Sequence, residues 1–531
     1  MSKILITSSL PYVNGSIHLG NIAGSHLPAD VMARYYRLQN QSVVFISGSD
    51  DYGTTSMLKA IEENCSPYEL CNKYRQKQIA ANKWFNISFD HYGQTSCENP
   101  RDNSWIHTRI SSYLFTKLVD SKYVFEQTVQ QLYCTKLQSF VADRFITGTC
   151  YLCGYEKAKG DQCDQCCELL DGCQLINPIC SQNGNPLIIA NSDHLFLDLP
   201  KLTSKLTHWY TTVKSSWDKN SQIITEKWLQ DLQPRCITRD LTWGSPVPNT
   251  NLFGNKYQHK AIYPWIDALM GYISLTENRS DLWHDPNTKI IQFFSKDNIP
   301  FHTILLPAIL LAIEDPIYNK VSQVASCHYL LYQNQKFSKS EKIGIFADML
   351  PGLNIHVDYW RYYLLKIRPE TSDSSFNLHE FVDVCNSDLV NKFGNYVNRL
   401  LSLTKKHNHI QVLTCFHLQE LHHNYDIAMS HVHLRQALKY CLDALDIANK
   451  YLQDEAPWKL TDNSVNVIST GLYLLSEILS MLEPFIPESC HKIRSYFTIT
   501  NNYYTFYLDN YTLPFTKLNY DNLVTLLLKN Y

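Results

Sequence analysis

The part of the chain that most constrains the fold is residues 11–21, which follow a short apolar run at residues 4–6. This pattern predicts a strand, a tight turn at an Asn-Gly pair, and the start of a helix. Gly20 has no Cβ, so the backbone there can approach a bound group closely. The first N–H groups of a helix lack partners within the helix and carry partial positive charge, which favours a phosphate. We therefore predict a phosphate site with His18 and Asn21 as donors; the alternative is a surface turn with an isolated histidine.

A second stretch, far along the chain, carries positive charge, which complements the negative charge of a phosphate. Residues 336–340 read Lys-Phe-Ser-Lys-Ser, which places Lys336 and Lys339 on either side of Ser338 in a short polar loop. Two ammonium groups at this spacing can neutralise a polyphosphate and stabilise charge that develops on it. We therefore predict that this loop, the lysine loop, clamps a polyphosphate.

The order of apolar runs predicts an α/β fold. Residues 43–46 read as a buried strand, and the polar residues 47–51 follow it directly. Polar groups at the carboxyl ends of parallel strands are where α/β sheets bind ligands. Short apolar runs that alternate with helical periodicity predict the first half of a doubly wound, Rossmann-type parallel sheet over residues 1–117. The same alternation of short apolar runs with helical periodicity predicts the second half of this sheet over residues 232–326.

Three further segments differ from these two halves in composition and in predicted secondary structure. Residues 118–231 are rich in cysteines and loops, as expected for a module inserted between the halves of the sheet. Residues 327–387 contain the lysine loop and a short α+β connection. Residues 388–531 read as successive amphipathic helices, with apolar residues at helical spacing over residues 472–482 before Pro484. We predict an all-α helix bundle for this last segment.

Four cysteines in the inserted segment have the spacing of a metal site. Cys150 and Cys153 form one Cys-x-x-Cys pair, Cys163 and Cys166 form another, and nine residues separate the pairs. Four thiolates in two tight turns complete a closed tetrahedral site for one structural zinc ion. The chain has 17 cysteines and shows no export signal, which favours thiols and metal over disulfides. The alternative of buried core cysteines fits poorly with the charged residues around them.

Composition and hydropathy argue against two classes of protein. A formal net charge of −3 argues against a generally basic nucleic-acid coat protein, although RNA binding needs only a local basic patch. The apolar run at residues 304–313 contains Pro307 and is too short to span a bilayer. We expect a soluble, cytoplasmic protein without a membrane partner.

The two phosphate-binding stretches resemble the two signatures of class I aminoacyl-tRNA synthetases, which that family writes His-Ile-Gly-His and Lys-Met-Ser-Lys-Ser. Further blocks, in the family's order, make the chain similar to methionyl-tRNA synthetases of the archaeal and eukaryotic cytosolic type. Asn21 and Phe337 differ from the bacterial signatures but are ordinary in the cytosolic type. The blocks lie at residues 10–15, 51–54, 86–90, 142–145, 194–200, 234–241, 296–302 and 358–365.

The resemblance implies a two-step reaction. The carboxylate of L-methionine attacks the α-phosphate of ATP and expels pyrophosphate, and the adenylate then esterifies the terminal adenosine of tRNA(Met). Charge on a pentacoordinate phosphorus and on leaving pyrophosphate needs prearranged donors and cations. The resemblance gives that catalytic role to His18, Asn21, Lys336 and Lys339. It gives the binding of ATP, which arrives with magnesium, to His18, Gly20, Asn21, Lys336, Ser338 and Lys339.

The same resemblance carries a methionine pocket onto seven positions. Asp51 would pair the α-ammonium, and aromatic rings suit a polarisable thioether. The alternative for Trp265 and Tyr272 is a place in the apolar core. Leu269 and Met270 depart from the family pattern and add bulk to the pocket wall. The seven positions are Leu10, Tyr12, Asp51, Trp265, Ala268, Tyr272 and His302.

Three residues in the helical segment are implied to read the CAU anticodon of tRNA(Met). Asn395 and Arg399 are four apart and share one face of a helix. Trp458 could stack on an unpaired base, which is how single-stranded RNA loops are usually recognised. The alternative for Trp458 is an aromatic residue that caps the bundle.

Two alternative functions stay open. One is a class I synthetase for another aliphatic amino acid, although the chain lacks the large editing insertion of the valine, isoleucine and leucine enzymes. The other is a relative that binds tRNA or ATP without catalysis, because Glu341 and Lys342 replace the usual Arg-Gly after the lysine loop. The intact His18, Asp51, Lys336 and Lys339 argue against it. We expect a monomer, because the sequence shows no appended dimerisation module.

The cytosolic type often has a second zinc knuckle, with one Cys-x-x-Cys pair on each side of the first knuckle. In this chain Cys134 is followed by Leu137 at the earlier position, and Cys180 is followed by Asn183 at the later one. Two thiolates cannot complete a closed tetrahedral site. We therefore predict one zinc ion per chain.

Overall fold

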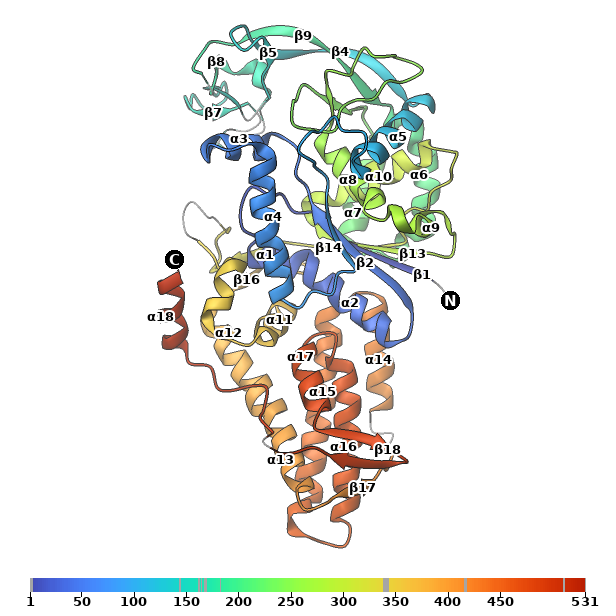
Figure 1. Ribbon diagram of the computed structural model, residues 1–531, viewed down its shortest axis with the longest axis vertical. Coiled ribbons are helices and arrows are strands. Elements are labelled where there is room, and N and C mark those ends of the chain that lie inside the picture. The colour runs from blue at the N-terminus through green and yellow to red at the C-terminus, as the bar shows by residue number, and fades with distance from the viewer. Residues whose placement is uncertain are drawn as a thin grey trace.

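The computed structural model describes residues 3–142, 145–160, 163, 165–166, 170–181, 183–337, 343–414, 418–509 and 511–530. The molecule is elongated (Figure 1). The cysteine-rich insertion forms one end, the parallel sheet lies in the middle, and the helical bundle forms the other end.

A five-stranded parallel sheet forms the centre of the molecule. Its strands lie in the order β14-β13-β1-β2-β3, and every pairing is parallel. The strand order reverses between β1 and β13, which confirms the predicted doubly wound topology. The strands are β1 (Lys3–Ser8), β2 (Ser42–Ser49), β3 (His91–Gln94), β13 (Lys289–Ser295) and β14 (Gln323–Cys327).

Two hydrophobic cores cover the two faces of this sheet. Successive residues of a strand point to opposite faces, so Ile4 and Ile6 of β1 pack in one core and Leu5 packs in the other. The first core holds α2 and continues into the helical bundle, and the second holds α5 and α8. The helices around the sheet are α1 (Leu19–Asn21), α2 (Leu27–Leu38), α3 (Thr54–Glu62), α4 (Pro67–Trp84), α5 (Ile106–Asp120), α8 (Pro264–Ser274), α9 (Asp281–His284) and α10 (Leu306–Ala312).

The insertion is built on two small antiparallel sheets. A long ribbon of β4 and β9 carries the chain away from the parallel sheet, and the second sheet lies at its far end (Figure 1). The paired cysteines lie in the loops next to the strands of this second sheet. The first sheet comprises β10 (Arg235–Cys236), β9 (Ile188–Leu197), β4 (Val124–Cys134) and β5 (Ser139–Phe140). The second comprises β7 (Ala158–Lys159), β6 (Ile146–Thr149) and β8 (Ile176–Cys180). Helices α6 (Leu199–Val213) and α7 (Lys219–Gln230) and the short pair β11 (Thr238–Arg239) and β12 (Ala261–Ile262) lead back to the parallel sheet.

The C-terminal part is the predicted helical domain, with one addition. A three-stranded antiparallel sheet lies on the bundle, in the order β17-β19-β18, so this domain is not purely α-helical. Its strands are only three or four residues long, which is too short for a period-two pattern to stand out in the sequence. They are β17 (His409–Gln411), β18 (Phe497–Thr500) and β19 (Tyr503–Phe506). Before the bundle come β15 (Leu330–Tyr332), β16 (Ser374–Phe376), α11 (Val357–Lys366) and α12 (Leu378–Cys385). The bundle helices are α13 (Asn395–Thr404), α14 (Gln419–Ser430), α15 (Leu434–Glu455), α16 (Ser464–Leu482) and α17 (Pro487–Arg494). The last helix, α18 (Tyr520–Asn530), lies outside the bundle and packs beside α12 (Figure 1).

Helix α16, which contains the apolar helical pattern of residues 472–482, has the length and apolar composition of a membrane span. It packs against α13 and α15, and 61% of its most apolar window is buried inside the protein. Packing within the bundle therefore accounts for its apolar character.

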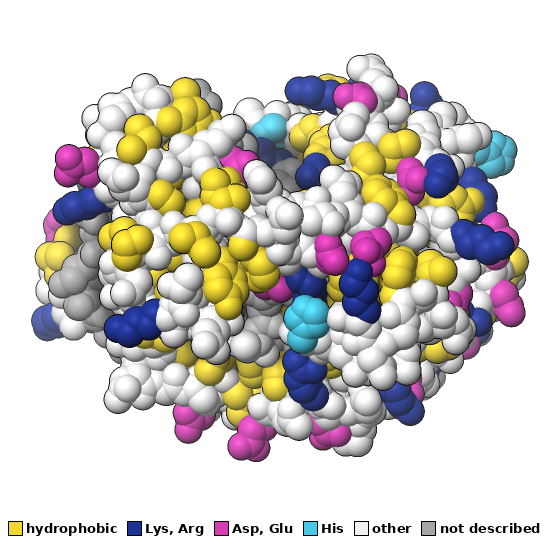
Figure 2. Space-filling model, turned by 90° about the horizontal axis from the view of Figure 1, so that it is seen from above, with side chains coloured by type: hydrophobic (Ala, Val, Ile, Leu, Met, Phe, Trp, Pro, Cys, Tyr) yellow, Lys and Arg dark blue, Asp and Glu magenta, His cyan; other side chains and the backbone are white. Residues whose placement is uncertain are grey.

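Charge on the end that carries the insertion is mixed. Figure 2 shows lysine and arginine side chains interspersed with aspartate and glutamate, among exposed hydrophobic groups. The side chains described on this face therefore form no continuous basic surface, in keeping with the small net charge.

The residue limits of the five predicted segments, 1–117, 118–231, 232–326, 327–387 and 388–531, stay predictions.

Candidate active site and metal site

A cavity of about 560 Å³ opens at the carboxyl ends of β1 and β13, where the strand order reverses. Doubly wound sheets bind ligands at this position. We call it the central cavity. Nine residues predicted from the sequence line it: Leu10, Tyr12, His18, Gly20, Asn21, Trp265, Ala268, Tyr272 and Lys336.

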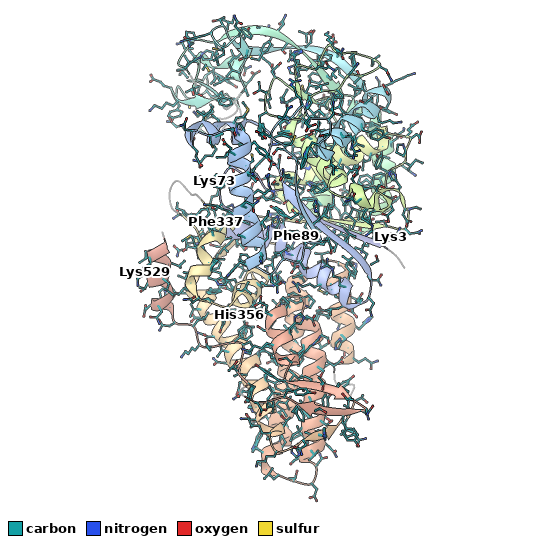
Figure 3. All side chains as sticks on the ribbon, viewed as in Figure 1. Lys3, Lys73, Phe89, Phe337, His356 and Lys529 are labelled. Atoms are coloured by element: carbon teal, nitrogen blue, oxygen red, sulfur yellow. The ribbon has the colours of Figure 1, made fainter. Side chains whose placement is uncertain are left out.

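His18 lies at the start of α1, where the sequence predicts a phosphate site. Its imidazole stacks on Phe337, which Figure 3 labels, with ring centroids 4.5 Å apart. Burial lowers the pKa of this imidazole to about 4, so the ring is neutral at pH 7. Its Nδ1 has no hydrogen-bond partner in the described part of the chain. A Cβ on residue 20 would lie 2.9 Å from that nitrogen, so Gly20 is what leaves room for the ring.

Asn21 closes the first turn of the same helix. Its side-chain oxygen accepts a hydrogen bond from the backbone N–H of His18 at 3.1 Å. The oxygen therefore faces the backbone, and the amide nitrogen at the other end of the group can donate to a ligand. This arrangement suits a helix N-terminus that receives an anion.

The lysine loop is described only up to Phe337. Lys336 is exposed and lines the central cavity. Ser338 and Lys339 lie outside the described residues, as do Glu341 and Lys342. After this gap the chain runs through Gly344, whose φ of +117° and close approach to Phe337 exclude a larger residue.

Tyr272 and His302 form a fixed pair at the side of the cavity. His302 Nδ1 donates to the carbonyl oxygen of Asn298 at 2.9 Å, so its Nε2 accepts from the Tyr272 hydroxyl, also at 2.9 Å. Burial lowers the pKa of His302 to about 4, which keeps this neutral form. His302 stacks on Phe294 and lies behind Tyr272 rather than in the cavity wall. The hydrogen bond from Tyr272 to His302 therefore fixes the orientation of the tyrosine ring.

Of two adjacent carboxylates, Asp50 lines the cavity and the predicted Asp51 does not. Asp51 is fully buried and its Oδ2 accepts from Arg75 at 2.8 Å and from the Ser96 hydroxyl at 2.6 Å, away from the cavity. Its neighbour Asp50 lines the cavity instead. Burial, with repulsion from Asp51 and Asp267, raises the pKa of Asp50 well above its ordinary value. No lysine or arginine of the described chain pairs with Asp50, so it is the carboxylate open to a cationic ligand.

Tyr12 and Trp265 lie at the boundary between the central cavity and a second cavity. The two residues are 39% and 43% exposed, and both line both cavities. The second cavity, of about 640 Å³, lies between the part of the chain around the parallel sheet and the insertion; we call it the outer cavity. In its wall Arg239 lies over the ring of Tyr263, with the guanidinium carbon 3.9 Å from the ring centroid.

The two residues of α8 that differ from the family pattern, Leu269 and Met270, lie in different surroundings. Leu269 lines the central cavity and is 3% exposed, whereas Met270 is buried behind it. Leu269 therefore adds bulk to the cavity wall as expected, and Met270 adds it to the core.

The four predicted metal ligands form one compact cluster. The sulfur atoms of Cys150, Cys153, Cys163 and Cys166 all lie within 4.8 Å of one another. Two of the separations are 3.9 Å and 3.5 Å, near the edge of about 3.8 Å of a tetrahedron with zinc–sulfur bonds of about 2.3 Å. Gly154 follows the first pair with a φ of +77°, the conformation of a tight turn. The cluster fits a structural zinc ion.

Cys134 and Cys180, which lie where the cytosolic type often has a second knuckle, belong to one small core. The Asn183 amide donates to the sulfur of Cys134 at 3.6 Å, and Cys180 is buried in the same small core. Within the described ranges, the first knuckle is the one group of three or more candidate ligands. The number of zinc ions stays a prediction.

The three predicted anticodon residues lie in the bundle. Asn395 begins α13 and is exposed, and Arg399 follows one turn later on the same face. The guanidinium of Arg399 lies over the ring of Trp458, 5.0 Å from its centroid. Trp458 is in the turn between α15 and α16 and is 42% exposed, and its role in reading the anticodon stays a prediction.

Comparison with known proteins identifies the family. Residues 4–401 match the family described as class I tRNA synthetases (M), and residues 408–514 match the anticodon binding domain of methionyl tRNA ligase. The chain belongs to the methionyl-tRNA synthetase family. Among curated relatives it is 38% identical to the probable cytoplasmic methionine–tRNA ligase of Dictyostelium discoideum, over 96% of this chain and 71% of the relative. It is 40% identical to the human cytoplasmic enzyme over 91% of this chain and 55% of that one.

The fold is also that of a solved member of the family. Mycobacterium tuberculosis methionyl-tRNA synthetase, in complex with methionyl-adenylate, aligns with a TM-score of 0.72 at 20% identity. The alignment covers 93% of this chain and 94% of that one. The chain thus spans nearly all of this bacterial protein but only 55 to 71% of the two eukaryotic relatives named above.

Sequence reasoning missed several cavity residues. Asp297, His328 and Tyr329 line the central cavity, at or beyond the carboxyl ends of β13 and β14. The signal was present, because the polar residues that end parallel strands mark ligand sites. The block at residues 296–302 contains Asp297, which lies just after the end of β13.

Proposed function

We propose that the chain ligates L-methionine to tRNA(Met) through a methionyl-adenylate, with release of AMP and diphosphate. One observation carries the proposal. A single cavity at the strand-order reversal brings together the helix-terminal site of His18, the Lys336 side chain and the Tyr272–Trp265 aromatic wall. Family membership supports the same reaction.

Activation needs stabilisation of charge on the phosphates of ATP. We infer that neutral His18 and the amide of Asn21 donate to phosphate oxygens at the N-terminus of α1, where Gly20 lets the nucleotide approach. Lys336, with Lys339 and Ser338, neutralises the leaving diphosphate. Magnesium enters with ATP and supplies further charge neutralisation; no described carboxylate is assigned to it. Stabilisation of this kind acts where charge develops and so lowers the barrier.

Methionine recognition follows from the cavity wall. We assign the α-ammonium to Asp50 in place of Asp51, because Asp50 faces the cavity without a cation. Burial, followed by repulsion from Asp51 and Asp267, raises the pKa of Asp50, and an ammonium beside it would stabilise its charged form. Tyr272, held by His302, and Trp265 pack on the thioether, with Leu10, Tyr12 and Ala268 completing the wall.

The tRNA spans both ends of the molecule in this proposal. Asn395, Arg399 and Trp458 read the anticodon on the bundle, and Trp458 offers a stacking face. The terminal adenosine reaches the adenylate through the outer cavity, which shares Tyr12 and Trp265 with the central one. The zinc cluster shapes the insertion that bounds the outer cavity. We propose a cytoplasmic monomer without a membrane partner, since several curated relatives are named cytoplasmic.

Amino-acid-dependent exchange of pyrophosphate into ATP tests the proposal. The purified chain is supplied with each amino acid in turn, without tRNA. Exchange with methionine supports it. Exchange only with valine, leucine or isoleucine would assign a different substrate, and exchange with none would leave a protein that binds without catalysis.

A further inference from the structure

One aromatic ring at the rim of the central cavity lies against two lysines. Tyr329 is half-buried and lines the cavity beside Lys336. The Nζ atom of Lys296 is 4.0 Å from the centroid of its ring, and that of Lys336 is 5.7 Å away. The face of an aromatic ring attracts ammonium groups within about 6 Å. The ring therefore holds two cations that repel each other.

The two lysines differ in their other partners. Lys296 pairs with Asp373 at 2.9 Å, and the same carboxylate oxygen accepts from the backbone N–H of Tyr329, also at 2.9 Å. Lys296 is thus neutralised and anchored. Lys336 is exposed and pairs with no carboxylate among the residues that the structure describes. The Tyr329 ring is the group that lies against its ammonium.

The ring itself is held at both ends. Its hydroxyl donates to Oδ2 of Asp297, another residue of the cavity wall, and its backbone is fixed by Asp373. Burial, followed by the hydrogen bond to Asp297, raises the pKa of the hydroxyl far above neutral pH, so it stays a donor. Tyr329 is therefore a rigid platform rather than a mobile surface side chain.

We propose that Tyr329 is a positioning residue that holds the Lys336 ammonium at the cavity rim for the phosphates of ATP. The proposal rests on the function given above. A free lysine loses much side-chain entropy when it is fixed, and an ammonium already held at the ring loses less. A cation–π contact at an exposed site is weak, so a phosphate can take over the ammonium without resistance. The ring thus positions the Lys336 ammonium before ATP binds, and its contact is weak enough for the phosphates of ATP to replace it.

A double-mutant cycle tests the proposal in the full chain. Tyr329→Leu removes the ring, Tyr329→Phe keeps it but loses the bond to Asp297, and Lys336→Met removes the cation. The readout is methionine-dependent pyrophosphate exchange, with kcat and KM for ATP and for methionine. We expect Tyr329→Leu to lower kcat/KM for ATP by about 2- to 30-fold, the range of a cation–π contact, with KM for methionine unchanged. Tyr329→Phe retains most of the activity. In the Lys336→Met background, Tyr329→Leu has no further effect.

The controls separate the alternatives. Tyr503→Leu, at an exposed tyrosine of β19, leaves exchange unchanged, and thermal melting shows that each variant is folded. If Tyr329→Leu costs the same factor with and without Lys336, or raises KM for methionine equally, the ring does not act through the lysine and the proposal is wrong. If the unaltered chain shows no exchange with any amino acid, the proposed function fails and this inference falls with it.

Discussion

Exchanging each of two adjacent carboxylates for an amide separates their roles. Asp50→Asn removes the carboxylate that lines the cavity without a cationic partner. A hydrogen bond to a charged group contributes about 1.5–3 kcal/mol, so KM for methionine should rise roughly 10- to 150-fold. The free energy of unfolding should stay the same or rise, because an unpaired buried carboxyl with two acidic neighbours is removed.

Asp51→Asn is the matched control. It breaks the buried pair with Arg75, whose side chain is 3% exposed, and leaves that guanidinium without its carboxylate. Breaking a buried ion pair from one side costs about 3–5 kcal/mol of stability. Urea unfolding and steady-state exchange kinetics of the two variants give the comparison. A rise in KM for methionine in Asp51→Asn at unchanged stability, with Asp50→Asn unaffected, would refute the reassignment.

Four further predictions concern the loop, the bundle, the metal and pH. Lys339→Ala should slow exchange by on the order of 100-fold with little change in methionine affinity, as when one charge-stabilising donor is lost; a near-normal rate would remove Lys339 from the mechanism. Trp458→Ala should weaken tRNA charging by roughly 1–3 kcal/mol while tRNA-independent exchange is unchanged; parallel loss of both would give the tryptophan a structural role. Metal analysis should find one zinc ion per chain, bound by Cys150, Cys153, Cys163 and Cys166, and two equivalents would contradict it. Because burial holds the folded-state pKa of His302 at about 4, below its ordinary 6.5, stability is full above pH 6.5 and falls by roughly 3 kcal/mol towards pH 4; urea unfolding at several pH values should show this, with a flatter profile in His302→Gln.

Local patterns in the sequence predict much of this fold. The strand–turn–helix at residues 11–21 and the polar residues after residues 43–46 locate the cavity, because parallel strands bring their carboxyl ends to one edge of a sheet. The paired Cys-x-x-Cys spacing predicts the metal cluster, because it depends only on nearby residues.

What the sequence did not predict depends on contacts between distant residues. Asp50 and Asp51 are adjacent and chemically identical, and the Asp51 carboxylate is held away from the cavity by Arg75 and Ser96, which lie 24 and 45 residues further along the chain. The contacts of Tyr329 with Lys296 and Asp297 join segments that share no local pattern. The strands of the small sheet on the bundle come from places about ninety residues apart, so no single window contains both partners.

Charging of tRNA by the purified chain tests the central claim most directly. One transcript carries the tRNA(Met) sequence with its CAU anticodon, and a second differs only in those three bases. We predict a methionyl ester on the first and at least a severalfold loss of kcat/KM on the second, since the cavity and the bundle act on one tRNA. No ester on the CAU transcript with methionine and ATP, or an equal rate with both transcripts, would contradict the account.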